Sequence, residues 1–281
     1  MTNLKEIIVL KHADSVDRTY ERNWIDFYDY GGQRTMEDAL HKIRHFNNVA
    51  LPLQLPKRRA DKDTWLADPP LSVIGTLTAE EVGRRLRTDQ FNTVDFGGFV
   101  YSSPCLCCIQ TADCLLRGLE AQNVKVRIEP SLANWRSQHR FVPPTWVGMN
   151  KQSYKEGYCG ISNIDQSYEP LMKGSDWKPE ETLKQLIERL EKLTKHLMKK
   201  HSGKIALLIA HGCIISGIDR CLLPNREDKP RPLSWVRYYR EVPRLSSASY
   251  KIEGDAWVSQ PSVIFSFAHL PNGVCDWKCY A

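Results

Sequence analysis

The chain has 281 residues, of which 42% are hydrophobic and 26% are charged, so it can bury one large core and has the composition of an ordinary globular protein. Its formal net charge of +6 favours anionic partners, but the basic residues are spread along the chain, which argues against a nucleic-acid-binding protein. Residues 1–6 carry charges where a signal peptide is apolar, and the longest apolar run, 205–216, is too short to cross a bilayer. We therefore expect a cytoplasmic protein that has no membrane contact and keeps its nine cysteines reduced.

Segments typical of strands and helices alternate along the chain. Apolar or alternating runs predict strands at 6–10, 98–102, 124–128, 204–210, 249–252 and 262–267. Helices are predicted at 78–88, 104–121, 179–201 and from 211 to about 223. The first three open with the capping-box pattern of Thr78, with Pro104 and with Pro179. The helix at 179–201 is the clearest, because its leucines recur at spacings of three and four residues.

This alternation predicts an α/β fold. Buried strands separated by helices form a mostly parallel central sheet with helices on both faces, which makes a three-layer sandwich. We expect a single domain over residues 1–281, with long irregular insertions at roughly 13–75 and 135–176.

Two histidines follow predicted strands of this sheet. His12 comes after the strand at 6–10, and His211 comes directly after the strand at 204–210. The carboxyl ends of parallel strands meet at one edge of a sheet, where folds of this type bind ligands. Either histidine alone could be a structural residue of the core, but the pair indicates a candidate site.

Short motifs around these histidines resemble those of the histidine phosphatase (phosphoglycerate mutase-like) superfamily, in the same order. The motifs are Lys11 to Asp14, Pro70 to Gly75, Tyr101 to Pro104, Ile109 to Ala112 and Leu208 to Gly212. Further segments at 16–17, 53–58 and 128–132 are similar to one branch of that superfamily. This branch contains the phosphatase domain of the suppressor of T-cell-receptor signalling proteins and the ecdysteroid phosphate phosphatases.

The resemblance implies a histidine phosphatase fold and a phosphoryl-transfer site. In this family one histidine attacks the phosphoryl group and becomes phosphohistidine, while arginines and a second histidine bind the phosphoryl oxygens. A carboxylic acid protonates the leaving oxygen. By resemblance His12 would be the nucleophile and His211 the second histidine, and the chemistry needs no cofactor and no metal.

The sequence departs from the family in the phosphate pocket. Lys11 stands where the family has an arginine before the nucleophile, and a lysine lacks the planar fork that grips phosphate. Ser15 and Cys107 stand in the places of two further arginines. Asn134 stands where the acid is expected, before Trp135, and an amide cannot donate a proton as an acid does.

These departures lead us to expect a pseudophosphatase. Losing one oxyanion donor costs roughly 10²–10³ in rate and losing the acid about 10²–10⁴, so the combined loss is on the order of 10⁶. The protein would then be a binding or scaffold protein for an anionic or phosphorylated ligand or for a protein partner. The alternative is a phosphomonoesterase that hydrolyses phosphotyrosine or a small phosphate ester through phosphohistidine. In that case Asp14, Arg136, His139 or Arg140 would replace lost groups.

The cysteines and the C-terminus suggest two further properties. Cys105, Cys107, Cys108 and Cys114 fall in one predicted helix, and outside that helix only Cys275 and Cys279 have a spacing typical of zinc ligands. We therefore expect no metal site and interpret Cys107 as a small buried residue. Members of the branch commonly dimerise, and apolar C-terminal residues either form such a homodimer interface or pack on their own domain. These residues are Phe265, Phe267, Leu270, Trp277 and Tyr280.

Overall fold

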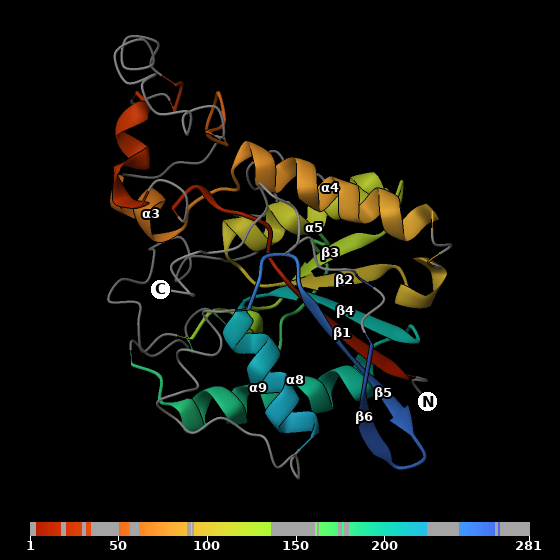
Figure 1. The fold of residues 1–281 in the computed structure, drawn as a ribbon. Helices are drawn as coiled ribbons and strands as arrows, with labels where there is room; N and C mark the ends of the chain where they lie inside the picture. The colour runs from red at the N-terminus through yellow and green to blue at the C-terminus, as the bar shows by residue number, and fades with distance from the viewer. Residues whose placement is uncertain are drawn as a thin grey trace.

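The computed structural model describes the chain in several stretches. Its strands form one sheet (Figure 1). The described residues are 4–17, 21–29, 32–34, 51–56, 62–88, 91, 93–135, 161, 163–173, 176, 180–223, 242–261 and 264. The strands are β1 (Glu6–Lys11), β2 (Phe99–Ser102), β3 (Lys125–Ile128), β4 (Ile205–Ala210), β5 (Ser247–Glu253) and β6 (Ala256–Gln260). They form a six-stranded sheet in the order β3-β2-β4-β1-β5-β6.

The sheet is mostly parallel, as the sequence predicts. Strand β1 pairs in parallel with β4, and β2 pairs in parallel with both β3 and β4. Strand β5 runs antiparallel to β1, and β6 continues the sheet as the second strand of an antiparallel hairpin. Strand β6 was not among the predicted strands, and the strand predicted at 262–267 falls largely outside the described residues.

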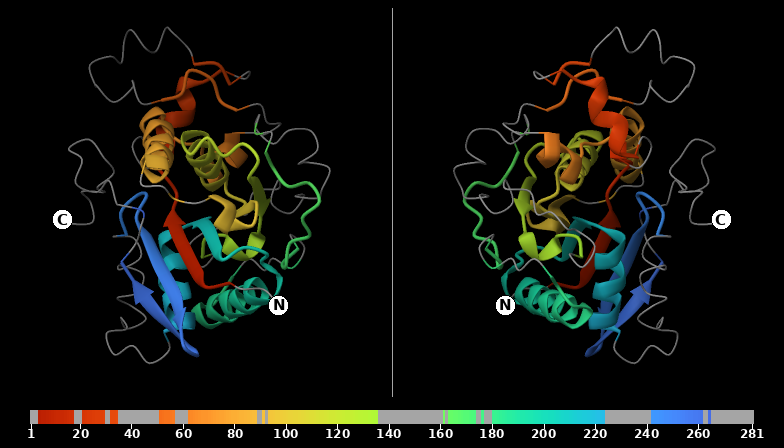
Figure 2. Two further views of the ribbon diagram at one scale, coloured as in Figure 1. Left: turned by 90° about the vertical axis from the view of Figure 1, so that its right-hand side faces the viewer. Right: turned by 90° about the vertical axis from the view of Figure 1, so that its left-hand side faces the viewer.

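The central strands are buried on both faces because their apolar side chains alternate between two helical layers. Ile8 and Leu10 of β1 pack into a core with helices α4 (Val73–Thr88) and α5 (Leu106–Gly118). Ile7 and Val9 face the opposite layer, where α8 (Leu183–Lys200) and α9 (Gly212–Leu222) contribute their leucines and isoleucines. Figure 2 shows the sheet lying between these two pairs of helices. The predicted α/β three-layer fold is confirmed.

Two predicted helix starts are wrong, and the capping residues explain why. Helix α4 begins at Val73 instead of Thr78, because the Ser72 hydroxyl accepts a hydrogen bond from the Gly75 N–H. The Thr78 hydroxyl donates to a carbonyl one turn earlier, as an interior helical threonine does. Helix α8 begins at Leu183 instead of Pro179, since Thr182 forms a capping box with Gln185.

The segment predicted as an irregular insertion at 13–75 contains ordered elements. It includes the 3-10 helix η1 (Glu21–Phe27), helix α3 (Lys62–Ala67) and the start of α4. Trp24, Leu51 and Trp65 pack there against α5 residues in a third apolar cluster. Two further 3-10 helices are η3 (Thr93–Phe96) and η4 (Pro130–Leu132). Most of the second predicted insertion, and the C-terminal residues that suggested a homodimer, lie outside the described residues.

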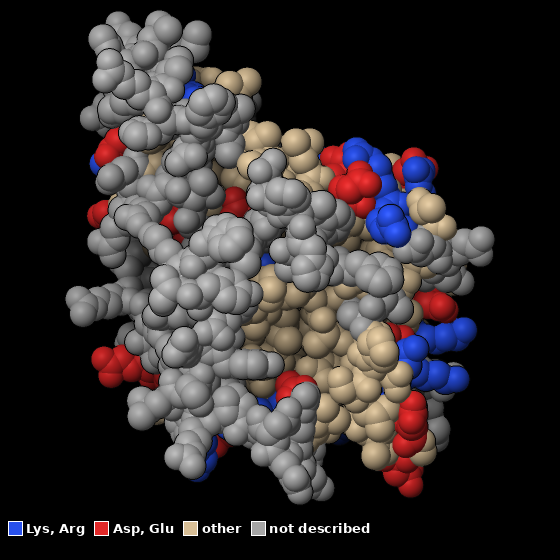
Figure 3. All heavy atoms as spheres, viewed as in Figure 1, with Lys and Arg blue, Asp and Glu red and all other residues tan. Residues whose placement is uncertain are grey.

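The described surface carries charges of both signs. On the face shown in Figure 3, lysine and arginine side chains lie among aspartate and glutamate side chains instead of forming a stripe of one sign. Arg84, for example, pairs with Glu80 and Glu81 on α4. None of the helices in the described stretches is both long and apolar enough to cross a membrane.

Candidate active site

The site lies where β1 and β4 end side by side. Lys11 and Ala210 are the last paired residues of these parallel strands, so the next residues, His12 and His211, come together. Their ring centroids are 5.1 Å apart, the rings meet edge to face, and each histidine is only 6% exposed. The structure therefore brings together the two histidines that the sequence singled out.

His12 is held in the form that a nucleophile needs. Its Nδ1 lies 2.8 Å from the Ala13 carbonyl oxygen, and since that oxygen can only accept, Nδ1 carries the proton and Nε2 carries the lone pair. The Ala13 N–H donates to the Thr111 hydroxyl of α5, which fixes this segment against the helix. Burial lowers the pKa of His12 well below its usual value, and nearby Arg244, His211 and Lys11 lower that pKa further. The imidazole is therefore neutral at neutral pH.

An arginine that the sequence analysis did not single out lies against Nε2 of His12. Arg244 Nη1 is 3.3 Å from His12 Nε2, and Arg244 Nε is 3.9 Å from a carboxylate oxygen of Asp14. Arg244 is 5% exposed and belongs to the turn before β5. Because β5 runs antiparallel to β1, residues just before β5 lie at the end of β1. No local motif marks this arginine, and only the strand pairing reveals it.

Lys11 holds the same turn. Its ammonium donates to the backbone carbonyl of Val242, and its side chain is buried. The Lys11 N–H donates to the Ser246 carbonyl at 2.9 Å, at the other end of the turn. The sequence identified Lys11 as a weakened phosphate ligand, but in this structure its ammonium binds the backbone next to Arg244.

His211 is the residue directly before helix α9, and its ring faces a polar group of Ser103, which follows β2, and one of Cys108 in α5. Its Nε2 lies 3.1 Å from the Ser103 hydroxyl and 3.5 Å from the Cys108 sulfur. The first turn of α9 begins at Gly212, so its N-terminal amides and their partial positive charge start beside the histidine pair. This edge of the sheet is consequently electropositive as well as buried.

Three cysteines at the start of α5 pack in the core. Cys105, Cys107 and Cys108 are buried, and burial raises the pKa of Cys105 and of Cys108 well above the usual value, with the Cys107 thiol adding to both shifts. Cys107, in the place of a family arginine, lies in the apolar cluster on the α4–α5 side of the sheet. In the described part of the chain, no three His, Cys, Asp or Glu residues are arranged to hold a metal ion.

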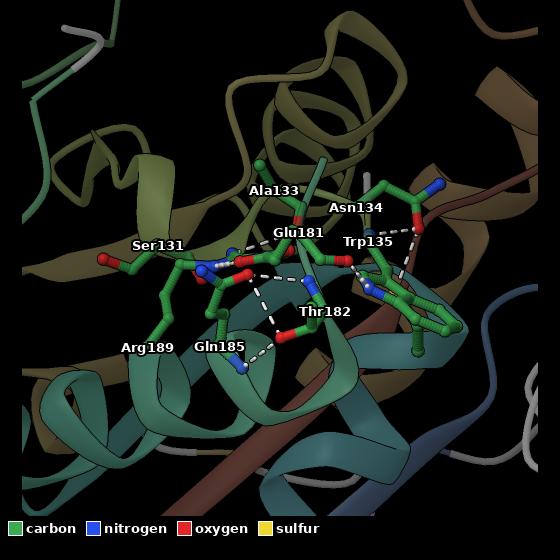
Figure 4. A network of polar contacts seen from close by, with 9 residues as sticks. Ser131, Ala133, Asn134, Trp135, Glu181, Thr182, Gln185 and Arg189 are labelled. Carbon is green, nitrogen blue, oxygen red and sulfur yellow. Dashed lines mark hydrogen bonds and ion pairs between the residues drawn. The ribbon is translucent and has the colours of Figure 1, made fainter. Parts of the chain in front are cut away.

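Asn134, in the place of the acid, is fixed by hydrogen bonds. Its side-chain oxygen accepts from the Cys213 thiol at 2.9 Å and from the Trp135 N–H at 3.0 Å. The segment before it is tied to α8, because Arg189 Nη1 donates to the carbonyls of Ser131 and Ala133 (Figure 4).

The same anchor extends to the other side of the segment. Arg189 also forms an ion pair with Glu181, and the Trp135 indole N–H donates to the Glu181 carbonyl. An amide at the acid position is therefore held in place by a well-connected network.

Ser15 and Asp14, two other residues predicted for the site, form hydrogen bonds near His12. The Ser15 hydroxyl donates to Asp17 at 2.6 Å, so it is engaged locally. The Asp14 carboxylate accepts from the Ser72 hydroxyl at 2.8 Å and lies beside Arg244. Arg136, His139 and Arg140 lie outside the described residues.

Comparison with known proteins assigns the family. A model of the histidine phosphatase superfamily (branch 1) matches residues 59–246. The chain belongs to this superfamily. The histidine phosphatase fold and the resemblance to its branch of signalling suppressors and ecdysteroid phosphatases, both predicted from the motifs, are thus confirmed.

Curated relatives of this histidine phosphatase superfamily member come from mammals and insects. The chain is 26% identical to mouse ubiquitin-associated and SH3 domain-containing protein B over 97% of its length, which is 40% of that protein. It is 28% identical to Bombyx mori ecdysteroid-phosphate phosphatase over 97% of its length, which is 38% of that protein. The chain thus spans about two fifths of the length of these relatives.

A solved structure supports the fold. The crystal structure of the Bombyx mori ecdysone phosphate phosphatase in complex with tungstate matches with a TM-score of 0.72 and 22% identity. The match covers 99% of this chain and 100% of that one. The assignment of His12 and His211 as the two family histidines, of positions 11, 15 and 107 as lost arginines and of Asn134 as the lost acid stays a prediction from the motifs.

Proposed function

We propose that this chain binds a phosphorylated ligand at His12 and His211 and hydrolyses it very slowly, so that it acts as a binding or scaffold protein with a histidine phosphatase fold. The observation that carries the proposal is a contrast between the groups that would bind a phosphoryl group and the residue that would donate a proton. Arg244 and the α9 N-terminus supply positive charge beside the two histidines, whereas Asn134, which the family motifs predict in the place of the proton donor, is held by Cys213 and Trp135.

Binding is supported by two features that meet at one edge of the sheet. Arg244 supplies a buried guanidinium next to His12, and the α9 N-terminus adds partial positive charge beside His211. A phosphoryl group carries up to two negative charges and accepts several hydrogen bonds, so it matches these donors. The neutral His12 ring would face its phosphorus atom.

Slow turnover is supported by the chemistry of the leaving group. Cleavage of an alkyl phosphate ester leaves an alkoxide, which needs a proton from a positioned acid, and losing that acid costs about 10²–10⁴ in rate. Asn134 cannot supply it. The Asp14 carboxylate is engaged by Ser72 and Arg244 and suits the role of an anionic partner better than that of an acid.

A second candidate function is a phosphomonoesterase that acts through phosphohistidine on phosphotyrosine or a small phosphate ester. The observation that favours it is the state of His12, whose Nε2 lone pair and bound Nδ1 proton are those of a nucleophile. Esters with acidic leaving groups need little help from an acid, so aryl phosphates suit this site better than alkyl phosphates. Because the insect relatives are named ecdysteroid-phosphate phosphatases, a steroid phosphate is a further ester to test.

One experiment separates the two functions. Tungstate binding is measured by calorimetry for the wild type and for His12→Ala, and phosphate release is measured with an aryl and an alkyl phosphate. We expect tungstate to bind the wild type and to bind His12→Ala more weakly, with no His12-dependent release from the alkyl ester. Failure of the wild type to bind tungstate would refute the proposed function. His12-dependent release from both esters, within about tenfold of the Bombyx mori enzyme in kcat/KM, would establish the phosphatase instead.

A further inference from the structure

The turn before β5 has a defined shape that directs Arg244 toward the histidines. Ser246 closes the turn, because its N–H and its hydroxyl both donate to the Pro243 carbonyl at 3.3 Å and 2.7 Å. Lys11 holds both ends, through its ammonium on the Val242 carbonyl and its N–H on the Ser246 carbonyl. The turn is thus bound to the residue that directly precedes His12.

The backbone of this turn is strained at a buried position. Leu245 has φ of 53°, in the left-handed region that a leucine rarely adopts, and its side chain is fully buried in the α4–α5 core. Such a conformation persists only where surrounding contacts impose it, and it is found most often at functional sites. Here the strained residue directly follows Arg244 and fixes the direction in which the arginine leaves the turn.

The burial of Arg244 favours an anion as its ligand. A guanidinium that is 5% exposed has lost most of its hydration, so anionic partners stabilise it, as the Asp14 carboxylate 3.9 Å away does. Its Nη1 donates to Nε2 of the neutral His12 imidazole, the nitrogen whose lone pair would attack a phosphoryl group if His12 is the nucleophile. A cation in this position raises the local potential where the substrate oxygens would sit.

We propose that Arg244 is the phosphoryl-binding arginine of this site, provided by the turn before β5 in place of the arginines missing at positions 11, 15 and 107. The proposal rests on the proposed function as a phosphate-binding site. When a phosphoryl group enters, the guanidinium exchanges its hydrogen bond to His12 Nε2 for hydrogen bonds to phosphoryl oxygens. His12 Nε2 is then released to face phosphorus, and Lys11 serves as the anchor of the turn.

The proposal predicts a specific loss of anion affinity. Arg244→Gln removes charged hydrogen bonds to the ligand and should weaken tungstate binding about 10- to 100-fold in calorimetry. Arg244→Lys keeps the charge but lacks the fork, so we expect affinity to fall by at least about threefold. The matched control is Arg117→Gln, which removes one exposed arginine of α5 that contacts Glu80 and Asp113. Its tungstate affinity should stay within about twofold of the wild type.

The outcomes of this calorimetry distinguish the role of Arg244 from the proposed function. Suppose that the wild type and Arg117→Gln bind tungstate, that His12→Ala binds it more weakly, and that both Arg244 variants bind like the wild type. Then Arg244 is only structural, and this inference is wrong while the proposed function stands. If the wild type itself fails to bind, the proposed function is wrong. Should Arg244→Gln fail to give a cooperative unfolding transition, Arg244→Lys decides the question, because unchanged affinity in that variant contradicts the need for a guanidinium.

Discussion

The thiol of Cys213 donates a hydrogen bond to the side-chain oxygen of Asn134 at 2.9 Å. Burial raises the pKa of Cys213 to about 11, so the thiol keeps its proton and stays a donor at neutral pH. Cys213 lies in the first turn of α9, directly after the His211-Gly212 pair. The residue in the place of the acid is therefore bound to the helix that begins at the second histidine, and the same thiol could hold a carboxylate there.

Asn134→Asp tests whether the missing acid limits turnover. Aspartate has nearly the shape of asparagine, so its carboxylate can keep the hydrogen bonds from Cys213 and the Trp135 N–H. We expect His12-dependent hydrolysis of an alkyl phosphate to rise by at least about tenfold, and that of an aryl phosphate to rise less, because only the alkyl leaving group needs a proton. Phosphate release checks this, with Asn134→Asp/His12→Ala as the control. Equal gains for both esters would contradict an acid role.

The sequence predicted the histidine pair because the rule behind it is local. A buried apolar run that ends in a histidine can be recognised without a structure, and parallel strands place such ends at one edge. His12 and His211 needed only those two observations. The family motifs then added Lys11, Ser15, Cys107 and Asn134 as positions that had changed.

Arg244 could not be found in the same way. Its place depends on the antiparallel pairing of β5 with β1 and on a left-handed Leu245, and neither leaves a mark in the local sequence. The start of α4 was missed for a related reason, since the pattern from Thr78 to Glu81 fits a capping box and also fits the interior of a helix. A single hydroxyl, that of Ser72, decides between the two starts through its contact with the Gly75 N–H.

The stability of the fold should fall as the pH falls below about 6.5. The folded state lowers the pKa of His12, mainly by burial, so the unfolded chain binds more protons between the folded and unfolded pKa values. Protonation in that window therefore favours unfolding, with a slope of up to about 1.4 kcal/mol per pH unit for one histidine. Urea unfolding at several pH values between about 5 and 7.5, a window around the ordinary histidine pKa, measures it.

The share of His12 in this pH dependence can be isolated. His201 is also buried with a lowered pKa and contributes to the slope in every variant that keeps it. His12→Gln should therefore flatten the dependence without abolishing it. An identical slope in the wild type and in His12→Gln would mean that His12 does not titrate differently in the folded and unfolded states.

Arg189→Met should destabilise the segment that carries Asn134. The substitution leaves Glu181 nearly buried without its ion pair and removes the donor from the Ser131 and Ala133 carbonyls. Breaking a buried pair from one side costs about 3–5 kcal/mol in the free energy of unfolding. The control is Arg84→Gln on the exposed face of α4, which should lose far less stability, because exposed ion pairs contribute little. Similar losses in both variants would show that the buried network does not stabilise the fold as described.

Two glycines, Gly75 near the site and Gly118 further from it, face backbone oxygens. A Cβ on Gly75 would lie 2.1 Å from the Asp14 carbonyl oxygen, and a Cβ on Gly118 would lie 1.9 Å from the Glu80 carbonyl oxygen. Both contacts are impossible, so either alanine variant must push a backbone segment away, at a cost of about 1–3 kcal/mol in stability. The two segments differ in what they carry.

Gly75→Ala should weaken anion binding as well as stability, whereas Gly118→Ala should weaken stability alone. The segment that a methyl group at position 75 would displace carries His12 and Asp14, and Asp14 lies beside Arg244. Gly118 lies where α5 packs on α4 in the outer layer, away from the histidines. Tungstate calorimetry on both variants, at a temperature where each is folded, makes the comparison. Equal tungstate affinities in the two variants would mean that the His12–Asp14 segment tolerates displacement, and that the site depends less on the packing of α4 than its geometry indicates.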